Sequence, residues 1–182
     1  MAQQVGAGSI GLGQKLQRVV SASPDALAIR YPDGRSLSNT ELYALVCRMA
    51  TGILARGVKA RQVMALVNRK SPEGLATMLA CNKLGVLYTN IDPESPPERA
   101  QRILDRCKPV LILVDDGAVA PYATMLGEFA GLAHSMSATI AAQTDDSALA
   151  HHDNDAAITG TDGAYIMFTS GSTGFPKGAV MT

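Results

Sequence analysis

The chain has 182 residues, of which 47% are hydrophobic and 18% are charged, a balance typical of a globular domain with a hydrophobic core. Its 16 basic and 16 acidic side chains cancel, which argues against nucleic acid or a membrane surface as a partner. The sequence contains neither an apolar run of the roughly 20 residues that cross a membrane nor a secretory signal, so we expect a cytoplasmic protein.

Short apolar segments alternate with helical ones along the chain. Residues 38–41 form a capping box that opens a helix, and Pro72 is typical of the first turn of another. Gly57 and Gly85 are expected to end these two helices. In chain order, we expect a strand at 26–31, a helix at 39–56, a strand at 63–67, a helix at 72–84, a strand at 86–91, a helix at 97–107, a strand at 110–114, a helix at 122–129 and a strand at 164–168.

This order of elements predicts an α/β fold with a mostly parallel sheet and helices on both faces. Residues 133–161 are poor in bulky apolar groups and are expected to form a long connection. The strand at 164–168 then returns to the sheet. Ligands of open α/β sheets bind at the carboxyl ends of the strands, so the residues after this strand are expected to lie at a binding edge.

Those residues combine glycines, hydroxyls and one lysine, in the order Thr-Ser-Gly-Ser-Thr-Gly-Phe-Pro-Lys-Gly from 169 to 178. Glycines let main-chain N–H groups approach an anion closely, hydroxyls add donors, and a lysine ammonium suits phosphate oxygens. Pro176 stiffens the segment. The sequence therefore predicts a phosphate-binding loop, whereas a solvated turn is the alternative for any such cluster. The predicted ligand-binding residues are Thr169, Ser170, Gly171, Ser172, Thr173, Gly174 and Lys177.

The charge distribution singles out Lys177. Residues 1–108 carry 15 basic and 8 acidic side chains, whereas residues 109–176 carry 8 acidic and no basic ones. Lys177 is therefore the only Lys or Arg between residue 109 and the last residue. A single cation within a glycine-rich loop of an acidic stretch favours a specific anion over general solubility.

Two commoner nucleotide motifs do not fit the sequence. The Walker loop of NTPases requires lysine directly after glycine, but Pro176 precedes Lys177. Residues 6–11 match the pattern G-x-G-x-x-G, yet only five residues precede them, too few and too polar for the required strand. We expect a flexible leader and a first helix within residues 1–23, followed by the domain at 24–182.

The cysteine and histidine residues do not indicate a catalytic or metal-binding site. Cys47, Cys81 and Cys107 are widely spaced within predicted elements, and we expect reduced, buried thiols. His151, His152 and Asp153 lie near Asp155 in a polar connection. A metal site there would lack a framework to fix its ligands, so we predict no metal ligand and no catalytic nucleophile in this chain.

Three segments together resemble a known superfamily. Residues 168–178 are similar to the signature of the AMP-forming adenylate synthetases, which include acyl-CoA synthetases, adenylation domains of nonribosomal peptide synthetases and luciferases. Residues 36–42 resemble the first conserved block of that superfamily, and residues 82–99 resemble the second. Thr89 and Asn90 stand where Val-Pro is usual, and Leu84 replaces a small residue. The resemblance covers residues 24–182.

The resemblance implies the incomplete N-terminal part of a larger adenylation domain. In this reaction a carboxylate attacks the α-phosphorus of ATP, forming an acyl-adenylate and releasing pyrophosphate. The Thr169 and Ser170 hydroxyls, the N–H groups of residues 171–174 and the Lys177 ammonium would bind the β- and γ-phosphates. The blocks that supply the Mg²⁺-binding glutamate, the ribose-binding aspartate and the C-terminal lysine are expected beyond Thr182. The 182 residues alone are therefore expected to be inactive.

The nature of the acid and of its acceptor stays open at this point. Residues 91–93 and 97–99 favour the amino-acid-activating branch, in which the acceptor is a carrier protein. A fatty-acyl or aryl-CoA ligase, with CoA as acceptor, is the alternative within the enzyme class. A non-catalytic relic that keeps the sheet is the alternative outside it.

Overall fold

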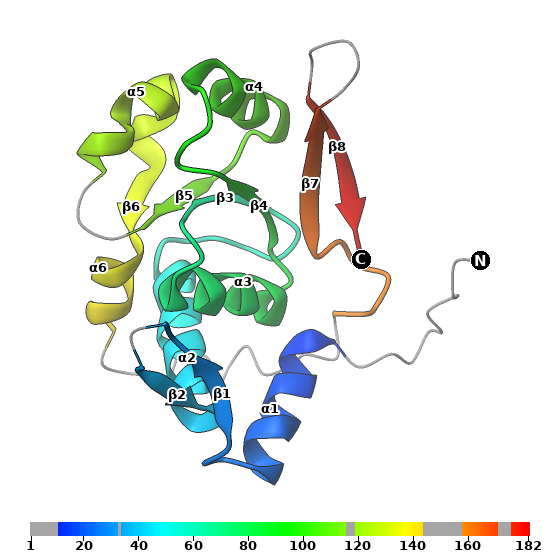
Figure 1. Cartoon of the computed structure of the whole chain (residues 1–182). Coiled ribbons are helices and arrows are strands. Elements are labelled where there is room, and N and C mark those ends of the chain that lie inside the picture. The colour runs from blue at the N-terminus through cyan, green and yellow to red at the C-terminus, as the bar shows by residue number, and fades with distance from the viewer. Residues whose placement is uncertain (1–10, 33, 116–118, 144–157, 171–175) are drawn as a thin grey trace.

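A computed structural model describes residues 11–32, 34–115, 119–143, 158–170 and 176–182 of the chain. Within these residues the protein is a layered α/β structure with a six-stranded sheet (Figure 1). The strand order is β6-β5-β3-β4-β7-β8, and every neighbouring pair is parallel except β7 and β8. The expected α/β class and the mostly parallel sheet are confirmed. The bounds of the strands are Val63–Val67 for β3, Leu87–Ile91 for β4, Leu111–Val114 for β5, Ala133–Ser135 for β6, Tyr165–Ser170 for β7 and Pro176–Met181 for β8.

Helices cover both faces of this sheet, as the sequence predicts (Figure 1). One layer contains α2 (Asn39–Ala55), α3 (Pro72–Leu84) and α6 (Met136–Ala141). The other contains α4 (Pro97–Cys107) and the short α5 (Ala123–Leu126).

The central strand β3 shows why both layers are stable. Its residues are apolar without alternation, and successive side chains point to opposite faces. Met64 and Leu66 pack with α2 and α3, whereas Ala65 and Val67 pack with α4 and α5. All four side chains have no exposed surface.

Helix boundaries follow the signals in the sequence. Ser38 caps α2 by accepting a hydrogen bond from Glu41 N–H at 3.2 Å, and the Glu41 carboxylate accepts one from Ser38 N–H at 2.8 Å. In α3, Ser71 accepts from Gly74 N–H at 3.0 Å. Gly85 ends α3 with φ of 64°, a conformation that favours glycine.

Elements outside the main sheet lie before α2. Helix α1 spans Leu12–Ala22, in the segment expected to hold a leader and a first helix, and it packs against α2 and α3. Strands β1 (Leu27–Arg30) and β2 (Ser36–Ser38) then form an antiparallel pair beside α2.

The structure corrects the sequence-based expectation in the second half of the chain. The helix expected at 122–129 is broken: α5 ends at Leu126, and 3-10 helices at Ala120–Tyr122 and Gly127–Leu132 flank it. Gly127 adopts φ of 55°, which interrupts the helix. The connection expected at 133–161 contains β6 and α6. Their short, weakly apolar sequences carry little periodicity, and packing against β5 and α2 stabilises them.

None of the three cysteines forms a disulfide within the described residues; Cys47 and Cys81 are buried, and Cys107 is partly buried. Burial raises the pKa of the Cys81 thiol to about 12 and that of Cys107 to about 11, so both are protonated at neutral pH. Among the described helices, none is both long enough and apolar enough to cross a membrane.

Thr89 is a buried departure from the residue usual at its position in the second block. Its side chain is 1% exposed, and its hydroxyl has no hydrogen-bond partner among the described residues. Leaving such a group unpaired costs about 1–3 kcal/mol. We therefore expect Thr89→Val, which keeps the shape and removes the hydroxyl, to raise the free energy of unfolding by roughly 1 kcal/mol in urea titrations.

Thr77→Val is the matched control for this substitution. Thr77 is equally buried, but its hydroxyl donates to the Glu73 carbonyl at 2.6 Å. Here the exchange should not stabilise the protein. Equal changes in the two variants would contradict the interpretation of Thr89.

Candidate functional site

The predicted phosphate-binding residues lie on the β7–β8 hairpin and the segment that joins its strands. Strand β7 lies beside β4, with Tyr165 opposite Tyr88, and the two rings stack with centroids 5.7 Å apart. β8 then runs antiparallel to β7 at the edge of the sheet. The expectation that a strand brings this segment to the sheet is confirmed. Gly171, Ser172, Thr173 and Gly174 lie outside the described residues.

The register of the hairpin brings two predicted residues together. Thr169 lies directly opposite Lys177, and Ser170 lies opposite Pro176. Directly opposed residues of an antiparallel pair direct their side chains to the same face, with Cβ atoms about 4.5–5.5 Å apart. The side chains of Thr169 and Lys177 therefore leave the backbone at neighbouring positions on one face of the hairpin. Both residues are exposed to solvent.

The hairpin also corrects the predicted extent of the loop. Thr169 and Ser170 are the last residues of β7, and Pro176, Lys177 and Gly178 are the first of β8. Proline is tolerated at the first residue of an edge strand because no ladder hydrogen bond is lost there. Main-chain pairing therefore fixes these residues on both sides of the segment.

Gly178 has a packing role that the sequence did not indicate. A Cβ atom at this position would lie 3.0 Å from Phe168 Cε1 and 3.2 Å from Ile166 Cγ2. The absence of a side chain lets the Phe168 ring lie across β8, where it packs against the apolar cluster beneath α4. Gly178 thereby helps to hold the hairpin against the domain.

A groove of about 560 Å³ lies beside the start of β8. The described residues that line it are Arg102, Arg106, Pro176, Lys177 and Gly178. Strand β8 contacts α4, and Figure 1 shows the hairpin next to that helix. Sequence reasoning missed the two arginines, because about 70 residues separate them from Lys177 along the chain. Lys177 is isolated in the sequence but has basic neighbours in the fold.

Polar residues also gather where β3 and β5 end. Asp115 accepts hydrogen bonds from the Arg69 main-chain N–H and from the Ser71 hydroxyl, the latter at 2.7 Å. Asn68 donates to the Asn90 side chain at 3.2 Å. These groups bond to one another, so they fix the turn that leads into α3.

The segment before β7 is held by Asp162. Its carboxylate accepts hydrogen bonds from Thr159 N–H at 2.8 Å and from the Thr159 hydroxyl at 3.1 Å, and it pairs with Arg61 at 3.2 Å. These bonds, led by the main-chain N–H of Thr159, lower the pKa of Asp162. The contacts tie the entry of β7 to the loop before β3.

No group of three or more His, Cys, Asp or Glu side chains in the described parts of the chain could hold a metal ion. The histidines at 151 and 152, together with Asp153 and Asp155, lie outside those parts, as does most of the glycine motif at 6–11. The described residues of the hairpin and groove offer hydroxyl and cationic donors, which suit an anion.

Comparison with known proteins identifies relatives over nearly the whole chain. Residues 16–182 match the family model described as AMP-binding enzyme. The hybrid PKS-NRPS synthetase gkaA of Penicillium citrinum is 30% identical over 178 residues, which are 94% of this chain and 4% of that protein. The nonribosomal peptide synthetase ungA of Aspergillus violaceofuscus is 36% identical over 159 residues, 87% of this chain and 2% of that protein. The chain thus spans only a small part of these relatives.

A solved structure shows the same fold. The N-terminal subdomain of NpsA from Klebsiella oxytoca, in complex with 3-hydroxybenzoyl-AMSN, superposes with a TM-score of 0.79 at 22% identity. The superposition covers 94% of this chain and 41% of that one. The likeness indicates that the chain has the architecture of part of a larger N-terminal subdomain.

Proposed function

Because the chain belongs to the AMP-binding enzyme family, we propose that it is the N-terminal part of an ATP-dependent, acid-activating enzyme. The reaction joins a carboxylate to the α-phosphorus of ATP and releases pyrophosphate. The observation that carries this proposal is the hairpin, which places Thr169 opposite Lys177 on two paired strands. Residues 24–182 form the N-terminal part of the adenylation domain, preceded by the leader and first helix.

The hairpin residues would act on the leaving group. Negative charge grows on the pyrophosphate oxygens as the bond to the α-phosphorus breaks. Donors fixed around these oxygens stabilise the transition state more than the bound substrate, and therefore accelerate the reaction. The proposed donors are the hydroxyls of Thr169 and Ser170, the N–H groups of residues 171–174 and the ammonium of Lys177. The substrate carboxylate is itself the nucleophile, so none of these residues acts as a general base.

An amino acid is the proposed substrate. Support comes from relatives that are peptide synthetases and from residues 91–93 and 97–99, which favour that branch. The acceptor would then be a carrier protein. A fatty-acyl or aryl-CoA ligase, with CoA as acceptor, is the second candidate, because the phosphate-binding hairpin would serve both classes equally.

Magnesium would enter with the nucleotide. Mg²⁺ prefers carboxylate and phosphate oxygens in octahedral geometry, whereas the described hairpin offers hydroxyl and cationic groups. We propose that ATP brings the metal and that the protein ligand lies outside these 182 residues. The described cysteines form no disulfide, which supports a location in the reducing cytoplasm.

The test is ATP–pyrophosphate exchange by the full-length protein in the presence of a panel of acids. We expect exchange that depends on one or a few amino acids and no exchange by the 182-residue chain alone. Exchange driven by fatty or aromatic acids, with formation of acyl-CoA and AMP when CoA is added, would favour the second candidate. No exchange with any acid, from a folded full-length protein, would reject the proposed function.

A further inference from the structure

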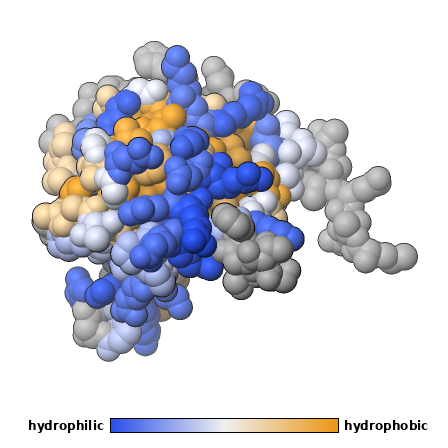
Figure 2. Space-filling view, turned by 90° about the horizontal axis from the view of Figure 1, so that it is seen from above, coloured by the Kyte–Doolittle hydropathy of each residue, from blue (hydrophilic) through white to orange (hydrophobic). Residues whose placement is uncertain are grey.

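The groove between α4 and β8 concentrates positive charge beside the hairpin. Arg102 and Arg106 line the groove from the helix, and Pro176, Lys177 and Gly178 line it from the strand. The two arginines and Lys177 are exposed. The volume of about 560 Å³ is in the range of small-molecule sites, roughly 300–1,000 Å³. Figure 2, which views the molecule from the side of α4, shows strongly hydrophilic residues gathered across the middle of this face.

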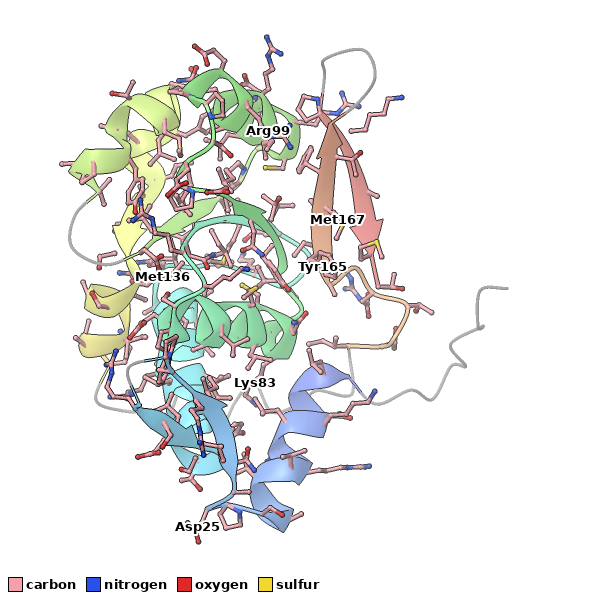
Figure 3. All side chains as sticks on the ribbon, in the orientation of Figure 1. Asp25, Lys83, Arg99, Met136, Tyr165 and Met167 are labelled. Carbon is pink, nitrogen blue, oxygen red and sulfur yellow. The ribbon has the colours of Figure 1, made fainter. Side chains whose placement is uncertain are left out.

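Helix α4 keeps its arginines on one flank. At about 100° per residue, Arg99, Arg102 and Arg106 fall within an arc of roughly 60°. Arg99 lies on the part of α4 near the hairpin (Figure 3). Because the spacing of three and four residues aligns side chains along a helix, these arginines form one basic stripe.

The other flank of α4 serves packing. Gln101 donates to the Thr124 carbonyl at 3.1 Å, and the Lys108 ammonium lies 5.4 Å from the centroid of the Phe129 ring. The carboxylate of Asp105 is paired with Lys108 at 3.1 Å. The buried face, which includes Ile103 and Leu104, lies between the two flanks. The Asp105 carboxylate is thus engaged on the flank away from the groove.

Positively charged side chains lie near the start of β8 on both faces of the hairpin. Thr169 and Lys177 lie on the same face as Tyr165, because alternate residues of a strand point to the same side. Phe168 and Gly178 occupy the other face, on which α4 packs. An anion with several phosphate groups at this end of the hairpin could therefore contact Lys177 from one face and the arginines from the other.

We propose that Arg102 and Arg106 form a polyphosphate subsite with β8 and bind the terminal phosphates of ATP, which leave as pyrophosphate. This inference rests on the proposed function and adds two phosphate-binding residues outside the glycine-rich segment. Arginine suits the role because its guanidinium is always charged and binds two phosphate oxygens at once. The two side chains would retain pyrophosphate as its charge grows.

The experiment measures binding of inorganic pyrophosphate to the 182-residue chain by ³¹P NMR titration. Wild type is expected to bind it. Arg102→Gln and Arg106→Gln should each raise the dissociation constant about tenfold, the change that one charge-assisted hydrogen bond produces. Lys108→Gln removes the same charge from the other flank of the helix and should change the constant less than twofold. Circular dichroism melts establish that each variant is folded.

Two further ligands separate this inference from its alternatives. AMP lacks the terminal phosphates, so both arginine variants should bind it like wild type. CoA carries a diphosphate and a 3′-phosphate. If the groove bound CoA instead of the terminal phosphates of ATP, the arginine variants would weaken the binding of CoA. The proposal would be overturned if wild type does not bind pyrophosphate, or if neither arginine variant weakens that binding. It would also be overturned if Lys108→Gln weakens pyrophosphate binding equally, or if the arginine variants weaken only the binding of CoA.

The outcome is distinguishable from failure of the proposed function. If the full-length protein shows acid-dependent exchange and its Arg102→Gln and Arg106→Gln variants have the same kinetics as wild type, the subsite is rejected and the proposed function stands. Absence of exchange in wild type would reject the proposed function, whereas pyrophosphate binding to the groove would still be measured by titration.

Discussion

Lys177→Ala is expected to lower ATP–pyrophosphate exchange by the full-length protein about 100-fold, the loss typical of removing one donor from a transition-state charge. Lys177 stands opposite Thr169 in the hairpin, and its ammonium is proposed to contact oxygens whose charge increases in the reaction. The effect should therefore fall mainly on the maximal rate. Steady-state kinetics with the preferred acid measures it.

Two control variants make this prediction specific. Lys177→Arg keeps the charge but changes its shape, and should retain part of the activity. Lys108→Ala removes an exposed lysine that pairs with Asp105, and should leave exchange unchanged. Activity of Lys177→Ala within threefold of wild type would remove the lysine from the reaction and with it the main support for the phosphate site.

Leu66→Ala is expected to lower the free energy of unfolding by about 3 kcal/mol, a typical cost of a cavity at a fully buried leucine. Leu66 lies in β3, which pairs with β4 on one side and β5 on the other, and its side chain has no exposed surface. The surrounding helices and strands can close such a cavity only partly. Urea denaturation followed by circular dichroism measures the change.

Leu27→Ala is the matched control for the core. The substitution removes the same atoms from a residue that is 53% exposed in β1, outside the six-stranded sheet. It should cost less than about 1 kcal/mol. A cost at Leu66 no larger than that at Leu27 would show that β3 is not the centre of the core.

Apolar side chains at the edge of the sheet are exposed because no further element covers them in the described structure. Val180 and Met181 are 58% and 40% exposed, and Met167 is 49% exposed. Strand β8 pairs only with β7 in the described sheet, so its apolar side chains lack the cover that β3 receives. Burial in this fold depends on strand position more than on side-chain type.

Local sequence signals determined much of the secondary structure of this protein. Apolar runs set β3 and β5 within one residue, because a strand buried on both faces needs no alternation. The capping box at Ser38 and the left-handed glycine at 85 set helix boundaries, because capping involves neighbours within a few residues. The order of glycines, hydroxyls and lysine at 169–178 predicts a phosphate ligand, which the Lys177 variants test.

Only the tertiary structure decided which residues meet. Strands β6 and β8, and helix α6, are stabilised by contacts with distant elements, and their sequences alone are too short to predict them. The pairing of Thr169 with Lys177 follows from hairpin register, and the approach of Arg102 and Arg106 follows from the packing of α4 against β8. Chain order brings neighbours together, but charges from separate elements combine only after the sheet has formed.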